Sequence, residues 1–324
     1  MKNLAQTRAL SNLSFESALS RLAPLAGILI LLLIAAVLAP TFYSPGNLSN
    51  VLRQGAILGI VALGQMIVIL VAGIDLSVGG VMGMALVVAA EVSGGESSAL
   101  VPALLIAFGL GVVVGSANAF LVVVRNVPPF VATLAVFILL EGARLAWTKG
   151  VPSGSVPEAL KTIGEGAFLG IPLALYVFAA IALVVAFILR RTAYGRMIYA
   201  VGSNPTAAKL AGVRVGSVVA STYVISGVLA TLGGLILSGY IGYVDRYLGQ
   251  GFELDSIAAA VVGGASLAGG RGTVFGTITG IALLAILSNL TLILALGEAS
   301  QLAVKGGVII AAVALQGKRT RAEA

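Results

Sequence analysis

The sequence has no cysteine, no histidine and few charges, since only 10% of its 324 residues are Asp, Glu, Lys or Arg. Without cysteine no disulfide or thiolate nucleophile can form. Without histidine the Ser-His catalytic arrangements are excluded, and the absence of both residue types excludes the common zinc sites. Soluble globular chains carry about 25% charged residues, which supply their water-facing surface. The chain therefore lacks the surface of a soluble protein, and we expect no catalytic residue, metal site or cofactor.

Hydrophobic residues, at 59%, and 42 glycines take the place of the missing charges. Glycine is frequent in transmembrane helices because it lets backbones approach closely, and a spanning helix needs about 20 mostly apolar residues. We predict an all-α membrane protein with about ten transmembrane helices. The apolar runs lie at 24–39, 52–72, 76–91, 101–124, 130–148, 172–190, 217–238, 256–268, 272–296 and 302–316.

No polar linker divides these runs, so 24–316 is predicted to be a single membrane domain between the tails 1–23 and 317–324. Both tails are basic, and cytoplasmic loops carry an excess of Lys and Arg. The loop 190–216 has no acid and five basic residues: Arg190, Arg191, Arg196, Lys209 and Arg214.

The loops 92–100, 149–171 and 239–255 are acidic or balanced in charge, which favours the outer side of the membrane. Ten crossings fit this pattern, with both termini in the cytoplasm. Arg53, on the predicted outer side, is the exception.

Two segments that overlap these runs, 73–83 and 253–272, carry an acidic residue near their start and are interrupted by glycine. Broken backbone at membrane depth is tolerated only where protein or a water-filled cavity satisfies it, and interrupted segments point to a transport site. We therefore predict a translocation pathway here, to which Asn289 is added. The pathway residues are Asp75, Ser77, Gly79, Glu253, Asp255, Gly263, Gly264, Ser266 and Asn289.

Close helix packing is the alternative role for the glycines. Three pairs have the GxxxG spacing that is typical of helix–helix contacts: Gly79/Gly83, Gly111/Gly115 and Gly276/Gly280.

The basic loop contains a short predicted helix. Asn204 or Ser203 can cap it, Pro205 suits its first position and Gly212 can end it. A helix of under two turns is unstable alone in water, so something must hold it. It can dock into the groove of a partner protein, or it can be an ordinary loop helix that carries topological charges.

Four charged residues are candidates for ionisable groups inside the membrane, where such side chains are costly and mark functional sites: Asp75, Glu141, Arg144 and Lys305. Glu141 and Arg144 are three residues apart and can pair. Asp75 can cap the helix that follows it. Lys305 can snorkel or pair with an acid of another helix. A secondary transporter coupled to protons or sodium through Asp75 or Glu141 is the competing function.

The net charge of +7 and the glycine-rich run 263–272 do not indicate nucleic-acid or nucleotide binding. The positive charges lie in short loops and tails, and the run lacks the Gly-Lys-Ser/Thr ending of a P-loop. We expect the bilayer, and no nucleic acid, as a partner.

Four ordered motifs resemble the signature of ribose-type ABC importer permeases, and the resemblance covers about 20–316. The motifs are GQ at 64–65 with GIDLSVG at 73–79, PPFVATL at 128–134, GRMIYAVGSNP at 195–205 continuing to 213, and GFELDSIAA at 251–259 with GGASLAGG at 263–270.

The resemblance implies the type II importer architecture in a bacterial inner membrane, without enzymatic activity of its own. Its implied partners are a second permease, a cytoplasmic ATPase and an extracytoplasmic binding protein for a sugar, usually a monosaccharide. ATP hydrolysis on the partner would drive alternating access. The implied ATPase-coupling residues are Gly202, Ser203, Asn204, Pro205, Ala207, Ala208, Lys209, Leu210 and Gly212.

The chain departs from the family pattern at three places, which leaves the identity of the sugar open. Glu141 stands where family members often carry Arg, 243–247 is more charged than usual, and Leu290 follows Asn289 where Gly is expected.

Overall fold

The computed structural model describes residues 24–151, 154–244 and 247–322, with side chains up to 310. The predicted tail 1–23, and Asp245 and Arg246 of the predicted outer loop 239–255, lie outside these ranges.

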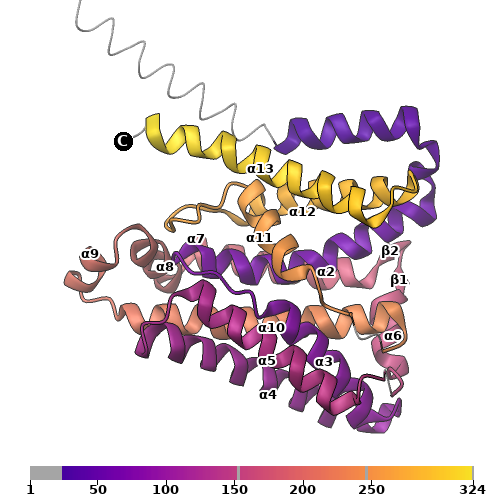
Figure 1. Cartoon of the computed structure of the whole chain (residues 1–324), viewed down its shortest axis with the longest axis horizontal. Helices are drawn as coiled ribbons and strands as arrows, with labels where there is room; N and C mark the ends of the chain where they lie inside the picture. The colour runs from indigo at the N-terminus through magenta and orange to yellow at the C-terminus, as the bar shows by residue number, and fades with distance from the viewer. Residues whose placement is uncertain (1–23, 152–153, 245–246, 323–324) are drawn as a thin grey trace, which may run out of the picture.

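Within the described residues the protein is helical apart from one short antiparallel hairpin, in which Ala167 pairs with Pro172 and Phe168 with Ile171. The elements (Figure 1) are, in order, a helix Pro24–Leu38, η1 Pro40–Tyr43, α2 Pro45–Leu70, α3 Val78–Ser93, η2 Ser97–Ala99, α4 Leu100–Ala119, η3 Phe120–Val124, α5 Pro129–Thr148, α6 Glu158–Glu165, β1 Ala167–Phe168, β2 Ile171–Pro172, α7 Leu173–Arg191, α8 Ala193–Ser203, α9 Pro205–Leu210, α10 Val215–Ile241, α11 Phe252–Val262, α12 Val274–Ile293 and α13 Glu298–Ala322.

Six helical stretches of the described chain are long and apolar enough to cross a bilayer, which confirms the all-α membrane class. They are Pro45–Leu70, Ser97–Val124, Pro129–Thr148, Leu173–Arg191, Val215–Ile241 and Val274–Ile293. The predicted number of ten is not confirmed. The helix Pro24–Leu38 and α3 are apolar but shorter, and α11 has only 11 residues.

The short α11 has a local cause. The predicted run 256–268 ends as a helix at Val262, because the chain turns at Gly263 and Gly264 has a φ of +94°. A backbone in this left-handed region favours glycine and does not continue a helix.

Helix α13 is longer than its apolar run 302–316, because it continues to Ala322, through most of the predicted C-terminal tail.

Several helix boundaries follow from their residues. Pro45 and Pro129 occupy the first positions of α2 and α5, where the missing N–H of proline costs nothing. Gly94 and Gly242 end α3 and α10 in the left-handed conformation.

Helix α2 forms the centre of the protein. It lies between α12 and α13 on one side and α3, α4 and α5 on the other (Figure 1), and its residues from Ala56 to Leu70 are all buried. Because the helix is apolar on every face, it needs neighbours all round. Gly64 packs directly on the backbone of Ser226 in α10, which is another well-buried helix.

The three glycine pairs with GxxxG spacing all lie at close contacts, which confirms the packing role predicted as the alternative. Gly79 and Gly83 pack on the 248–249 backbone, Gly111 and Gly115 on α10, and Gly276 and Gly280 on the 259–263 backbone.

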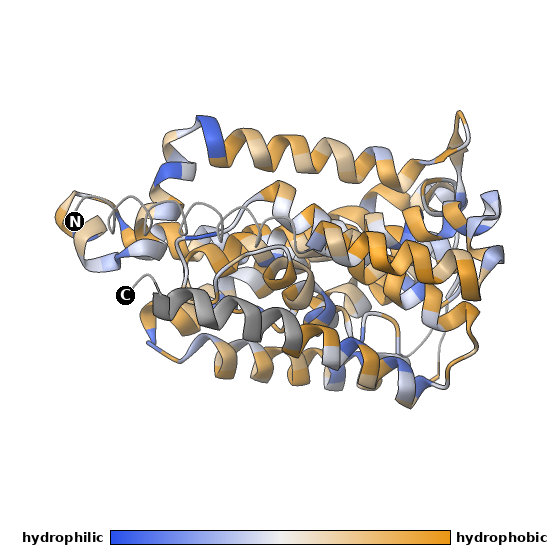
Figure 2. Cartoon of the chain, turned by 90° about the horizontal axis from the view of Figure 1, so that it is seen from above, coloured by the Kyte–Doolittle hydropathy of each residue, from blue (hydrophilic) through white to orange (hydrophobic). Residues whose placement is uncertain are grey.

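The protein has two distinct ends (Figure 1). Helices α8 and α9 lie at one end, here the α9 end, and α6 with β1 and β2 at the opposite α6 end. Figure 2 shows hydrophobic residues along most of the helix lengths and hydrophilic residues mainly toward the ends. This is the pattern expected of a protein whose middle is covered by hydrocarbon.

Arg53 has a structural role at the α6 end. Its Nη2 donates to the Glu165 carbonyl oxygen at 2.7 Å, and its guanidinium lies 5.2 Å from the centre of the Tyr240 ring. The bond satisfies a carbonyl at the end of α6, and the ring contact is a cation–π interaction. These contacts account for the one arginine that departs from the predicted charge pattern.

Candidate functional site

Helix α9 forms where the basic loop predicted a short helix. The Asn204 side chain accepts a hydrogen bond from the Ala207 N–H at 2.9 Å, and Pro205 is the first helical residue. The helix ends at Leu210, and Gly212 follows with a φ of +84°. Of the two predicted capping residues, Asn204 caps α9, whereas Ser203 belongs to the end of α8.

Ala208 faces the protein and its neighbours in α9 face outward. Ala208 is 4% exposed, and its carbonyl accepts from the Val213 N–H at 3.0 Å, which holds the end of the short helix. Leu210 is 86% exposed, and Lys209 is also exposed. Both side chains lie on the outer surface of α9. The surface available to a partner therefore excludes Ala208.

The α8 helix rests on the end of α2. A side chain at Gly202 would overlap the Leu70 carbonyl oxygen, so only glycine allows this approach. The same oxygen accepts a hydrogen bond from the Gly270 N–H at 2.9 Å. Three segments that are distant in the sequence thus meet at the α9 end: the end of α2, the end of α8 and the glycine-rich run 263–272.

Tyr199 bonds α8 directly to the glycine-rich run. Its hydroxyl donates to the Gly272 carbonyl oxygen at 2.8 Å. Burial raises the pKa of the Tyr199 hydroxyl above its ordinary value, and the charge of Arg190 offsets this only in part. The hydroxyl therefore stays protonated at neutral pH and remains a donor.

A polar face lies on α5, the segment 247–251, α11 and α13. Arg144, 2% exposed, donates to the Glu141 carboxylate at 2.6 Å and to the Leu248 carbonyl oxygen at 2.9 Å. The Gln250 amide donates to the same carboxylate at 3.0 Å. The predicted pairing of Glu141 with Arg144 is confirmed. Sequence reasoning missed Gln250, which ties the segment before α11 to α5.

The two acids at the start of α11 have separate partners. Both oxygens of Glu253 lie 3.0 Å from the Gly251 N–H, and a side chain at Gly79 would overlap this carboxylate. Asp255 accepts from the Lys305 ammonium at 3.0 Å, which joins α11 to α13. Of the two alternatives for Lys305, pairing with an acid on another helix is confirmed.

Asp75 lies in a buried cluster just before α3, together with Ser77 and with Asn118 of α4. It is 1% exposed, and its Oδ1 accepts from the Ser77 N–H at 3.0 Å and the Ser77 hydroxyl at 2.6 Å. The Asn118 amide donates to the Ser77 hydroxyl at 2.7 Å. Asp75 thus braces the turn before α3. The predicted cap of α3 by Asp75 is wrong. Asp75 accepts from the N–H of Ser77, which precedes α3, and no described side chain caps the first turn of that helix.

The predicted pathway residues fall at several separate places. Gly79 and Glu253 are in contact, and Asp75 bonds to Ser77. Gly264 and Ser266 lie in the turn of the glycine-rich run, whose Gly270 reaches the end of α2. Asn289 is buried in α12 and bonds to Asn47. The remaining two, Asp255 and Gly263, lie at the two ends of α11.

The chain matches the family described as the branched-chain amino acid transport system permease component over residues 47–313. The chain is 37% identical over 315 residues to the ribose import permease protein RbsC of Bacillus subtilis, covering 94% of this chain and 95% of the relative. It is also 37% identical over 299 residues to RbsC of Escherichia coli K12, covering 91% and 93% of the two chains.

A third relative carries a different sugar in its name. The galactose/methyl galactoside import permease protein MglC of Salmonella typhimurium is 36% identical over 308 residues, covering 89% of this chain and 91% of the relative. No solved structure matches the chain. The chain belongs to this family of transport permeases, in agreement with the ribose-type resemblance of its four motifs.

Proposed function

We propose that the chain is the membrane-spanning permease subunit of an ATP-binding-cassette importer that carries a monosaccharide into the cytoplasm. The relatives named for ribose and for galactose import support a sugar, since each covers about nine tenths of the chain at 36–37% identity. The family description names branched-chain amino acids, but the sugar permeases match over more of the chain. ATP hydrolysis belongs to a separate subunit, so this chain is not an enzyme.

The protein is a multi-pass inner-membrane protein, and we propose that it crosses the membrane ten times. The six long stretches would be joined by the helix Pro24–Leu38, α3, α11 and α13. The α9 end would face the cytoplasm, with both termini on that side. The five basic residues of the loop 190–216 at the α9 end support this orientation, because positive charge favours the cytoplasmic side.

The ATPase would dock on the outer surface of α9. The observation that carries this proposal is the exposed Leu210 on a helix whose inner face is fixed by Ala208 and by the cap at Asn204. A push on α9 would pass through α8 to the Gly202–Leu70 contact, and from there to the central helix α2. Residues 202–212 would therefore move as one rigid unit.

The polar face would line the translocation pathway. A second permease, identical or different, would lie opposite it. An extracytoplasmic binding protein would deliver the sugar. Glu141, whose side chain is 17% exposed, and the half-buried Glu253 offer carboxylate oxygens that can accept hydrogen bonds from sugar hydroxyls. Ion coupling through Asp75 or Glu141 is not favoured. The relatives that match over about nine tenths of the chain are named as sugar import permeases.

The test is Leu210→Glu in proteoliposomes that contain the permease, its ATPase and its binding protein. A buried unpaired carboxylate in the docking groove should weaken ATPase binding about tenfold or more and abolish ATP-driven sugar uptake. Leu169→Glu is the matched control, since Leu169 is 82% exposed in the hairpin of the α6 end. Normal ATPase binding and uptake by Leu210→Glu would overturn the coupling role of α9.

A further inference from the structure

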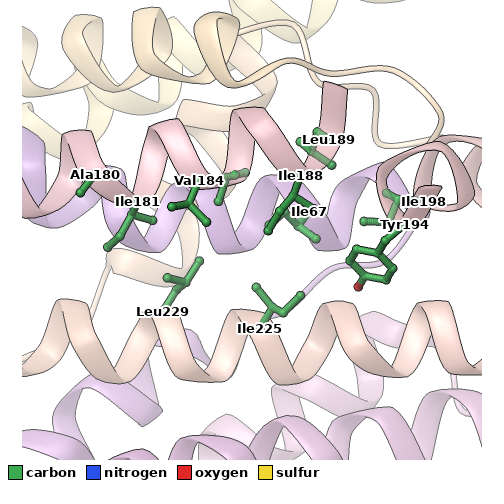
Figure 3. Close-up of a pocket in the computed structure, with 11 residues that line it drawn as sticks. Ile67, Ala180, Ile181, Val184, Ile188, Leu189, Tyr194, Ile198, Ile225 and Leu229 are labelled. Atoms are coloured by element: carbon green, nitrogen blue, oxygen red, sulfur yellow. The ribbon is translucent and has the colours of Figure 1, made fainter. Parts of the chain in front are cut away.

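An apolar crevice of about 310 Å³ runs between α7 and α10, with α2 beneath it. Figure 3 shows the α7 side chains along one wall, Ile225 and Leu229 of α10 along the other, and the Tyr194 ring at one end. Apart from this ring the lining is aliphatic: Ile67, Ala180, Ile181, Val184, Val185, Ile188, Leu189, Ile198, Ile225 and Leu229.

The crevice opens on the apolar side of the protein, away from the polar face. Leu183 and Phe187, on the adjoining surface of α7, are 72% and 62% exposed. Between 173 and 189, α7 carries no charged residue. The charged pairs of the polar face lie on α5, α11 and α13 instead. In a membrane protein a surface of this kind meets lipid chains.

The length of the crevice fits one leaflet. Its α7 wall runs from Ala180 to Leu189, about 14 Å at 1.5 Å per residue, close to half of the roughly 30 Å hydrocarbon core. At the far end the Phe178 ring packs over Gly59 of α2. A single acyl chain therefore matches the slot in polarity and in length.

A second, more polar cavity of about 540 Å³ adjoins the crevice at Tyr194, which lines both. The Tyr194 hydroxyl shares a 2.6 Å hydrogen bond with Ser221. The second cavity is lined by Arg214 and by Ser217, and α7 ends close by at Arg190 and Arg191. The apolar slot thus leads to a basic rim at the α9 end, where headgroups of that leaflet lie.

We propose that this pair of cavities binds one anionic phospholipid, with an acyl chain in the α7–α10 crevice and its phosphate at Arg214. The apolar crevice would hold the acyl chain, and Arg214 would pair with the negative charge of the headgroup. The site depends only on the protein being in a membrane and not on the sugar or on the coupling role of α9. Its headgroup end borders 211–214, so the lipid would also support the loop after α9.

The acyl-chain end is tested by native mass spectrometry of the purified full chain with added phosphatidylglycerol. Ala180→Trp fills the crevice and should weaken retention of the lipid about tenfold or more. Ala179→Trp is the matched control, because Ala179 is the neighbouring exposed alanine of α7 and does not line the crevice. Equal retention by both variants would overturn the proposal.

The headgroup end is tested by comparing phosphatidylglycerol with zwitterionic phosphatidylcholine of the same chains. Arg214→Gln should remove most of the preference for phosphatidylglycerol. Arg125→Gln should keep it, since Arg125 is an exposed arginine that lines neither cavity. A preference that survives Arg214→Gln would overturn the assignment of the phosphate site.

Cysteine substitutions give a second test of the acyl-chain end that does not depend on the bulky tryptophan of Ala180→Trp. The chain has no cysteine, so Ala180→Cys and Ala179→Cys each carry one thiol. Phosphatidylglycerol should slow maleimide labelling at position 180 and leave position 179 unchanged. If instead Ala180→Trp disrupts a permease dimer while lipid binding is intact, the crevice holds a second copy of the chain and the lipid proposal fails.

Discussion

Asn47 and Asn289 bond to each other through both side-chain amides, although they are 242 residues apart in the sequence. The Asn47 Nδ2 donates to the Asn289 Oδ1 at 2.8 Å, and the Asn289 Nδ2 donates back to the Asn47 Oδ1 at 2.9 Å. The Asn47 amide also donates to the Phe42 carbonyl oxygen at 2.8 Å. The start of α2 is therefore fastened to the last turns of α12.

Replacing both members of this pair should cost less than the sum of the two single replacements. Asn289→Leu leaves the Asn47 amide without its partner, and Asn47→Leu does the same to Asn289. We expect each single variant to lose about 1–2 kcal/mol of stability, and the double variant to lose less than the sum. Unfolding in detergent measures this. Additive losses would show that the two amides act independently, and a loss of uptake at unchanged stability would favour the predicted pathway role of Asn289.

The sequence predicts well those features that have a local cause. The helical class follows from apolar runs, the cap of α9 from Asn204 and Pro205, and the Glu141–Arg144 pair from residues on adjacent turns of one helix. Each of these depends on residues a few positions apart, where helix geometry alone sets the contact.

The contacts that join distant segments could not be predicted in the same way. Nothing near Gly202 in the sequence indicates that it meets Leu70, and Gln250 carries no sign of its bond to Glu141. The orientation of Ala208 was also hidden, because in a helix of six residues the inner face is chosen by the surrounding fold and not by periodicity. Hydropathy placed the end of α11 too late, at 268 instead of Val262, because apolar residues continue past the turn that ends the helix.

Arg144 should be essential for the stability of the polar face. Arg144→Met frees the Leu248 carbonyl oxygen and leaves Glu141, whose side chain is only 17% exposed, without its cation. We expect a loss of about 3 kcal/mol in the free energy of unfolding. Arg144→Met combined with Glu141→Gln should regain part of this, because no unpaired charge remains. Denaturant titrations in detergent measure the values, and a double variant no more stable than Arg144→Met would contradict the charge argument.

The Lys305–Asp255 pair should tolerate exchange of its partners. The two side chains are 22% and 29% exposed, so the pair is partly shielded from water. Lys305→Asp and Asp255→Lys each place like charges between α13 and α11, and we expect uptake to fall about tenfold or more in either. The double variant should restore most of the uptake. If the exchange restores nothing, one of the two residues has a role beyond the pair.

Gly202→Ala should separate ATPase binding from transport. The new methyl group would overlap the Leu70 carbonyl oxygen and force α8 away from α2, while the exposed surface of α9 around Leu210 stays as it is. We expect the ATPase to bind within about twofold of the wild type and sugar uptake to fall about tenfold or more, because the motion of α9 no longer reaches the central helix. Gly142→Ala is the control, since no atom outside its own helix lies within 4 Å of the added methyl group. Full uptake by Gly202→Ala would mean that the Gly202–Leu70 contact serves packing alone and that the force from the ATPase reaches α2 elsewhere.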